Sequence, residues 1–282
     1  EKYKKINIPI HFIIHDECHS ISNSTTRTFY DYFLNKYPFV KSIGFSATPN
    51  LDYEPYKNIL SHYSIYDSFL DDVIVPPKII WFKSNETINY QLILDNIPNL
   101  LEQMPYKKII IWCGMIDLCF EMAELWKKHP YFHNFIIATD TSVENDNQEF
   151  HSFEEFDQAP NNALLFCACK HREGSDIFNL DTCIFLDKVE NRNPKTFVQC
   201  VGRVLRKDKT NTKKYGLVID VKASSSIKIC DRMNEYLHID KNIFPWQYSF
   251  YKSKNIYINT LLLSHNLPIS SNFPTHHLSI DN

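Results

Sequence analysis

Two adjacent carboxylates near the start of the sequence could do chemistry. The apolar run Ile10 to His15 leads into Asp16 and Glu17, with Cys18 and His19 behind them. In open α/β sheets, ligands bind beyond the carboxyl ends of the strands, so this pair is well placed for a metal–phosphate site. One carboxylate can hold a hydrated Mg²⁺ while its neighbour orients or deprotonates a water. Taken alone, acids at a strand end are more often solvated turn residues or helix caps.

A zinc site of the metalloprotease type does not fit the same segment. His15 and His19 are four residues apart, but that motif needs a glutamate directly after the first histidine, on a helix. Asp16 occupies that place, and the preceding apolar run favours a strand. We therefore set the zinc interpretation aside.

A pair of guanidiniums lies near residue 205. The segment Pro194 to Arg206 predicts a helix with proline near its first turn. At about 100° per residue, one face is polar and holds Gln199, Gly202, Arg203 and Arg206. The other face is an apolar stripe that holds Phe197, Val201, Val204 and Leu205. Guanidiniums suit bidentate recognition of phosphate, and a solvated basic face is the alternative.

Two further polar segments follow apolar strands. Gly44 to Pro49 brings small hydroxyl residues to a strand end, where they either relay hydrogen bonds or form an ordinary turn. Arg172 to Ile177 places one of only five glycines at another such edge. The spacing Cys167-x-Cys169-x-His171 could bind a metal, but residues two apart on a strand share one face, so core packing is favoured.

The order of elements predicts the fold class. Ile116 to His129 is the clearest helix, with Asp117 in its first turn and Pro130 behind it. Predicted strands alternate with such helices and are Ile8–His15, Val40–Phe45, Ile79–Phe82, Lys107–Cys113, Asn134–Ala138, Ala163–Cys169, Thr182–Asp187 and Tyr215–Val221. Several are apolar on both faces, as parallel strands covered by helices are. The pattern predicts a doubly wound α/β architecture.

Prolines mark the expected domain boundaries. Pro76-Pro77 separates residues 1–76, which hold only two predicted strands, from residues 77–243, the size of one complete α/β lobe. Residues 1–76 are therefore expected to be the second half of a lobe. Beyond Phe244-Pro245, residues 244–282 either begin a further domain or dock on the second lobe.

Composition narrows the class of protein. The formal net charge of −3 provides no global basic field, which argues against histone-like proteins but allows a strand to be bound in one local groove. The apolar runs are far shorter than the roughly 18 to 20 residues of a membrane span, and no signal peptide opens the sequence. The eight cysteines lack paired CxxC clusters. We expect a soluble intracellular protein with reduced thiols and no membrane partner.

Taken in order, these segments resemble the motifs of superfamily 2 helicases and translocases of the DExH type. The matches are Asp16 to His19 with motif II, Ser46 to Thr48 with motif III, Lys108 to Cys113 with the motif IV strand, Arg172 to Ile177 with motif V, and Gln199 to Arg206 with motif VI. In that family two RecA-like lobes clamp ATP between them while single-stranded nucleic acid lies across both.

The resemblance implies a role for each candidate residue. Asp16 would hold Mg²⁺ through water, and Glu17 would position the attacking water. Arg203 and Arg206 would reach the γ-phosphate. The remaining positions would couple hydrolysis to the second lobe (His19, Ser46, Thr48), line the interface (Gln199, Gly202) or approach the nucleotide (Gly174, Asp176).

One departure concerns the phosphate-binding loop. The Walker A motif, G-x-x-x-x-G-K-[ST], should precede motif II, yet no glycine here is followed by lysine. We expect this chain to be the C-terminal piece of a longer motor that carries the loop upstream, and to hydrolyse ATP poorly or not at all by itself.

Three functions remain open at this point. The first is an ATP-dependent helicase or translocase, acting on DNA rather than RNA. The second is a nucleic-acid-binding scaffold that kept the fold and lost the motor. The third is a restriction-type or remodelling translocase that moves on duplex without unwinding it. Composition and the DECH tetrapeptide resemble helicases of large DNA viruses, which would place the protein in the cytoplasm, nucleus, viral factory or virion.

Overall fold

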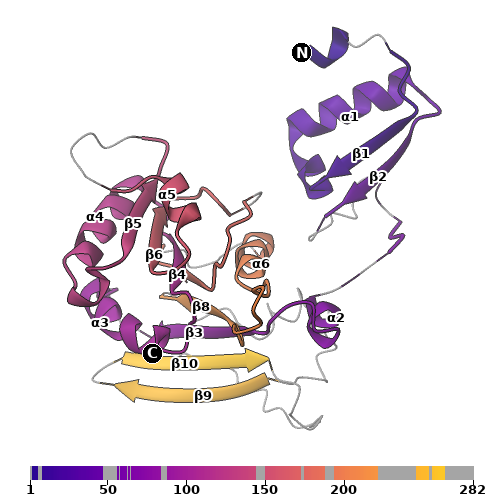
Figure 1. Ribbon diagram of the computed structural model, residues 1–282. Helices are drawn as coiled ribbons and strands as arrows, with labels where there is room; N and C mark the ends of the chain where they lie inside the picture. The colour runs from indigo at the N-terminus through magenta and orange to yellow at the C-terminus, as the bar shows by residue number, and fades with distance from the viewer. Residues whose placement is uncertain are drawn as a thin grey trace. The chain divides into compact units, whose positions relative to one another are not determined.

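The computed structural model describes residues 2–5, 8–46, 56, 58–61, 63, 65–83, 88–143, 150–172, 175–187, 194–221, 246–253 and 256–263. The chain forms two compact units, residues 1–63 and 64–282 (Figure 1). The sequence predicted a break at residues 76 and 77. The segment from 64 to 76 instead packs with the second unit, because Phe69 of α2 (Ile65–Leu70) lies in its core and the Val75 N–H donates to the Leu205 carbonyl at 2.9 Å.

The first unit is a small parallel pair of strands with a helix. Strands β1 (Phe12–Asp16) and β2 (Lys41–Phe45) pair in parallel and confirm both predicted strands. The 3₁₀ helices η1 (Lys2–Lys5) and η2 (Cys18–Ser22) and the helix α1 (Ser24–Lys36) complete it. Helix α1 buries Tyr30 and Phe33, and Tyr30 packs with Cys18 and Ile21 of η2. This packing fixes the turn that follows β1.

The second unit contains one sheet whose order is β5-β6-β4-β7-β8-β3-β10-β9. The bounds are β3 Pro77–Lys83, β4 Lys108–Trp112, β5 Ile136–Asp140, β6 Ala163–Cys167, β7 Thr182–Phe185 and β8 Gly216–Asp220. These six run parallel to one another, so every strand predicted in this region is confirmed.

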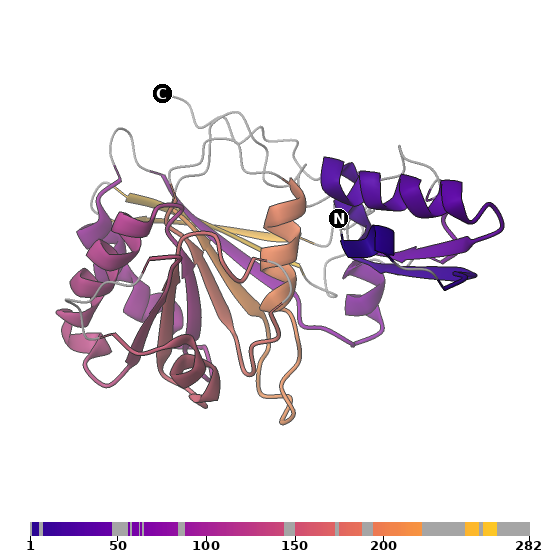
Figure 2. The ribbon, with the colours of Figure 1, turned by 90° about the horizontal axis from the view of Figure 1, so that it is seen from above.

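Helices cover both faces of that sheet. Helices α3 (Tyr90–Leu101) and α4 (Ile116–Lys127) bury one apolar cluster with η3 (Pro130–Phe132). Helices α5 (Phe153–Gln158) and α6 (Pro194–Arg203) bury the other, against the opposite face (Figure 2). Strands β4, β6 and β8 are buried along their whole length because they are covered on each side, which explains why only Lys108 and Asp220, at the ends of β4 and β8, interrupt their apolar sequence. The predicted α/β class is confirmed.

Two strands after residue 244 extend this sheet. Strand β10 (Ile256–Leu263) pairs antiparallel with β3 and with β9 (Trp246–Ser253). Of the two alternatives for the tail, these strands therefore dock on the second unit (Figure 1). Within the described ranges, none of the helices has the length and apolar character that a bilayer crossing requires.

Candidate functional site

The predicted carboxylate pair lies where strand β1 ends. Asp16 is exposed, and its Oδ1 accepts a hydrogen bond of 2.9 Å from the Glu17 N–H. Glu17 adopts a left-handed backbone conformation with φ 52° and ψ 49°. Such a conformation is uncommon for residues other than glycine and costs of order 1–3 kcal/mol, which the surrounding structure must offset. The turn thereby aims two acids out of the same strand end.

His19 joins this acid pair to the end of the neighbouring strand. Its Nδ1 lies 3.2 Å from Oε2 of Glu17 and 3.1 Å from Oγ of Ser46, directly after β2. The predicted coupling residues His19 and Ser46 are thus brought together, and Thr48 lies outside the described residues. Gly44 permits this approach, because a Cβ there would sit 2.7 Å from Cys18 Cβ.

Asp16 and Glu17 fit a hydrated Mg²⁺ better than a metal held by many protein ligands. A single exposed carboxylate is the usual protein share of a Mg²⁺ site, since this ion keeps several waters. Across the described ranges, no group of three or more His, Cys, Asp or Glu side chains could hold a metal ion together. That Asp16 holds such an ion through water stays a prediction.

Helix α6 ends at Arg203, three residues earlier than predicted, because the chain then turns and pairs with residues 74 and 75. The side chains predicted for the apolar stripe are nevertheless buried. Phe197, Val201, Val204 and Leu205 are all buried. On the polar face, a Cβ added to Gly202 would meet nothing within 4 Å. Neither amide atom of Gln199 has a hydrogen-bond partner among the described residues, although both atoms are buried. Unpaired buried amide atoms are costly, so this face is suited to a partner or ligand.

The two arginines that were predicted to reach the γ-phosphate, Arg203 and Arg206, have different surroundings. The Arg203 guanidinium donates from Nε and Nη2 to the Arg172 carbonyl at 3.1 and 3.0 Å, and from Nη1 to the Ser175 carbonyl. Arg206 is half exposed and forms an ion pair with the exposed Asp176. Arg203 therefore holds the loop between β6 and β7 in this structure, whereas Arg206 is available to solvent. Gly174 of that loop lies outside the described residues.

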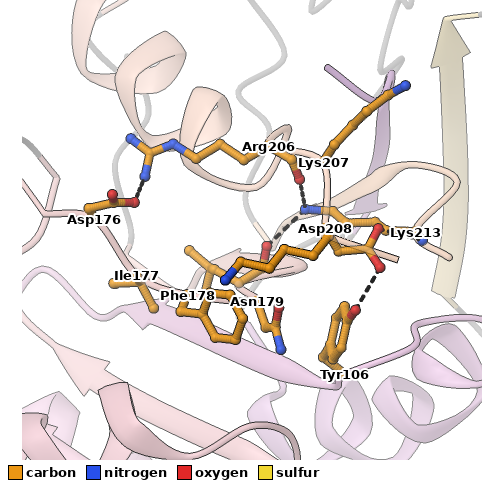
Figure 3. Close-up of a pocket in the computed structure, with 11 residues that line it drawn as sticks. Tyr106, Asp176, Ile177, Phe178, Asn179, Arg206, Lys207, Asp208 and Lys213 are labelled. Carbon is orange, nitrogen blue, oxygen red and sulfur yellow. Dashed lines mark hydrogen bonds and ion pairs between the residues drawn. The ribbon is translucent and has the colours of Figure 1, made fainter. Parts of the chain in front are cut away.

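Arg206 and Asp176 line a cavity of about 230 Å³ (Figure 3). The cavity also borders Phe178, Lys209 and Lys213. The buried Lys213 ammonium donates at 2.9 Å to the carbonyls of Arg206 and Leu180, which fixes the backbone of Arg206 to the start of β7. Lysines and an arginine outnumber the acids along the wall, so the cavity favours an anionic ligand.

Behind that cavity, Asp208 organises the loop that follows α6. It accepts bonds from the Tyr106 hydroxyl at 2.6 Å, the Thr210 hydroxyl at 2.5 Å and the Lys213 N–H at 3.1 Å. Burial alone would raise the pKa of Asp208, but these hydrogen bonds hold it well below its usual range. The carboxylate therefore stays ionised and keeps Lys213 next to Arg206.

Stability should depend on pH through the buried Asp181. Burial raises the pKa of Asp181 from 3.8 to about 6, despite bonds from the Tyr106 and Lys107 N–H groups. Because the pKa of Asp181 is higher in the folded state, its contribution to the free energy of unfolding is fully present below pH 4. That contribution is lost as the pH rises through 6. At about 1.4 kcal/mol per pKa unit, the loss is on the order of 3 kcal/mol.

Urea denaturation of wild type and Asp181→Asn at several pH values would measure this effect. We expect the free energy of unfolding of wild type, relative to the variant, to fall between pH 4 and 7. Asp117→Asn, an exposed first-turn acid of α4, is the matched control and should show no such trend. A difference between wild type and Asp181→Asn that is independent of pH would contradict the assignment.

Sequence reasoning missed Asp140, which contacts His171, because nothing in its own spacing distinguishes it. Asp208 and Lys213 belong to the charged run 206–214, for which the sequence allows either phosphate contacts or a solvated loop. Cys167 and Cys169 were expected to share a core face. Cys167 is buried as predicted, but Cys169 is exposed because β6 ends at Cys167.

The fold defines a class: the second unit contains a parallel sheet with helices on both faces, as the RecA-like C-terminal lobes of helicases do. Residues 92–208 match the family described as "Helicase conserved C-terminal domain". This part of the chain is therefore similar to the C-terminal domain of helicases.

Individual proteins agree with this assignment. The chain is 24% identical over 143 residues to DEAD-box ATP-dependent RNA helicase 50 of Arabidopsis thaliana, covering 49% of this chain and 18% of that protein. A putative HsdR subunit fragment of a type I restriction enzyme from Vibrio vulnificus YJ016 superposes with a TM-score of 0.59 at 20% identity, over 78% of this chain and 45% of the other.

The ATP-dependent Type ISP restriction-modification enzyme LlaBIII bound to DNA is a further structural neighbour. It superposes with a TM-score of 0.51 at 14% identity, over 83% of this chain and 20% of the other. At these identities, the solved structures share the fold. The chain spans less than half the length of each of these proteins.

Proposed function

We propose that this chain is the motif II to VI part of an ATP-dependent superfamily 2 helicase or translocase of the DExH type, acting on DNA. The observation that carries the proposal is the placement of Arg206. Three residues after the end of α6, its half-exposed guanidinium lines a cavity whose wall holds more basic than acidic side chains, inside a segment that matches the helicase C-terminal domain.

In this mechanism each group acts on the γ-phosphate of ATP. A water, oriented by Glu17, attacks the γ-phosphorus and gives its proton to the Glu17 carboxylate, while the bond to the β–γ bridging oxygen breaks and ADP leaves. Mg²⁺ held by Asp16 through water would neutralise phosphate charge. Arg206 would leave Asp176 and stabilise the charge that develops on the γ-phosphoryl oxygens. His19 and Ser46 would couple hydrolysis at the end of β1 to the end of β2, since their side chains are already in contact.

Nucleic-acid-stimulated ATP hydrolysis by the full-length protein tests this proposal. We expect single-stranded DNA to raise turnover more than single-stranded RNA of the same sequence. ATP turnover that neither single-stranded DNA nor RNA stimulates, in a protein that still binds DNA, would instead support the scaffold function. The matched DEAD-box relative is an RNA helicase, so the RNA arm of the assay is essential.

A duplex translocase is the second candidate, and the likeness in fold to two restriction-enzyme chains favours testing it. A strand-displacement assay measures unwinding, whereas displacement of a triplex-forming strand measures movement along intact duplex. Triplex displacement without strand displacement would select the translocase. Both activities should require ATP.

Gly202 offers a test of which helix face meets a partner. Glycine inside a helix is about 1 kcal/mol less favourable than alanine, and a methyl group here meets no neighbour. Gly202→Ala should therefore keep or raise the melting temperature, while ATP turnover falls because the added methyl group blocks the close approach of ligand or first lobe. Circular dichroism and an ATPase assay measure the two effects.

Gly216→Ala is the matched control for the Gly202 experiment. A Cβ at that position would lie 2.2 Å from the Val204 carbonyl oxygen, so this variant should lose stability first. Full turnover by Gly202→Ala would show that nothing approaches this face of α6.

A further inference from the structure

Three side chains form a continuous hydrogen-bonded chain at the carboxyl ends of β5 and β6. His171 Nε2 lies 2.6 Å from Asp140 Oδ2, and His171 Nδ1 lies 2.8 Å from Ser175 Oγ. The imidazole stacks on Phe153 with ring centroids 4.2 Å apart and an interplanar angle of 16°. These contacts leave the His171 side chain only 11% exposed. The ring is therefore held in one orientation from three sides.

The direction of the hydrogen bonds follows from the charge on Asp140. Burial would raise the pKa of Asp140, but bonds from Lys170 and His171 lower it below its ordinary value. An ionised carboxylate only accepts, so Nε2 of His171 carries a proton. In the neutral imidazole, Nδ1 then accepts from the Ser175 hydroxyl, and both ring nitrogens are satisfied.

The series of hydrogen bonds from Asp140 through His171 ends at Ser175, in the loop that contacts helix α6. The Ser175 carbonyl accepts from Arg203, as does the carbonyl of Arg172, which follows His171 directly. The Arg172 guanidinium is in turn bonded at 3.1 Å to the buried Asp187, behind β7. The loop is thus held by His171 on one side and by Arg203 on the other.

We infer that His171 is a positioning residue, which couples Asp140 at the end of β5 to the loop bound to Arg203 and so sets the placement of Arg203, and of Arg206 three residues beyond it, for catalysis. The inference rests on the proposed function. A serine–histidine–aspartate order also occurs in serine hydrolases, but here the same serine is bound through its carbonyl to Arg203, which favours an orienting role.

Steady-state ATP hydrolysis by the full-length protein tests the inference. We expect His171→Ala to lower kcat roughly 10- to 100-fold, the scale of a small misplacement of catalytic groups, with KM for ATP within about twofold. Asp140→Asn should lower kcat in the same way. Both residues act through the same series of hydrogen bonds. The kcat of the double variant should therefore be no lower than that of His171→Ala alone.

His151→Ala is the matched control. Its Nδ1 lies 3.0 Å from Glu155 Oε1, in an exposed pair outside the loop, so kcat should not change. A kcat of His171→Ala within twofold of wild type would overturn the inference. So would additive losses in the double variant, or a loss of kcat that only follows a lower melting temperature.

Amide hydrogen exchange provides a second readout that needs no turnover. Exchange at the backbone of residues 172 and 175–176 should become at least about tenfold faster in His171→Ala, while the core strand β4 is unchanged. Unchanged exchange in the loop would overturn the inference. A wild-type protein without turnover on any polymer would overturn the proposed function, and exchange would still decide whether His171 holds the loop.

Discussion

Glu17→Gln should reduce nucleic-acid-stimulated ATP turnover of the full-length protein by roughly 10²- to 10⁴-fold, the usual contribution of a general base. Glutamine keeps the size of the side chain but cannot accept a proton from water. The backbone at residue 17 is unaffected by this exchange, so the left-handed turn after β1 should persist. ATP binding should therefore remain close to wild type.

Rapid-quench measurement of γ-phosphate release, beside a fluorescent-nucleotide binding assay, separates chemistry from binding in this variant. Glu154→Gln is the matched control, because Glu154 is an exposed acid in the first turn of α5. Equal turnover by Glu17→Gln and wild type would contradict a water-positioning role. If Glu17→Gln binds ATP more weakly but releases γ-phosphate at the wild-type rate, Glu17 contributes to nucleotide binding instead.

Arg206→Ala should lower kcat by about 10³-fold or more, the range measured for arginine fingers. The side chain is half exposed, and its partner Asp176 is more exposed still, so the pair contributes little to folding. We therefore expect a large loss of turnover with a nearly unchanged melting temperature. Arg206→Lys should recover only part of the rate, since an ammonium cannot bind phosphate through two parallel bonds.

Lys127→Ala is the control for the Arg206 variants, as it removes an exposed cation from the last turn of α4. Arg203→Ala differs from Arg206→Ala in its expected effect. It should lower turnover and also speed amide exchange in the loop, because Arg203 binds the Arg172 and Ser175 carbonyls. If wild type is active and Arg206→Ala lowers kcat by tenfold or less, Arg206 is not the arginine that stabilises the γ-phosphoryl charge.

The parallel strands of the second unit could be predicted from the sequence because their signals are local. An uninterrupted apolar run such as Ile109–Trp112 indicates a strand covered on both faces, and the structure confirms it. Likewise, the 3.6-residue periodicity of α6 separates its buried stripe from the face of Gly202 and Arg203. The prediction that the acid pair and the arginines face one triphosphate stays a prediction.

Other features depended on contacts between distant parts of the chain. The sequence treated Arg203 and Arg206 as equivalent, yet the fold brings the Arg172 and Ser175 carbonyls to Arg203 alone. Asp140 and His171 are far apart in sequence and meet only because β5 and β6 pair in parallel register.

The sequence by itself thus determined the eight parallel strands, helix α4 and most of α6, since periodicity and composition act over a few neighbouring residues. The antiparallel strands β9 and β10 were not predicted from it. The tertiary structure decided which arginine is held and which is available, and where the tail strands dock. Those outcomes depend on strand order and register, which bring together backbone carbonyls and side chains that no local pattern relates.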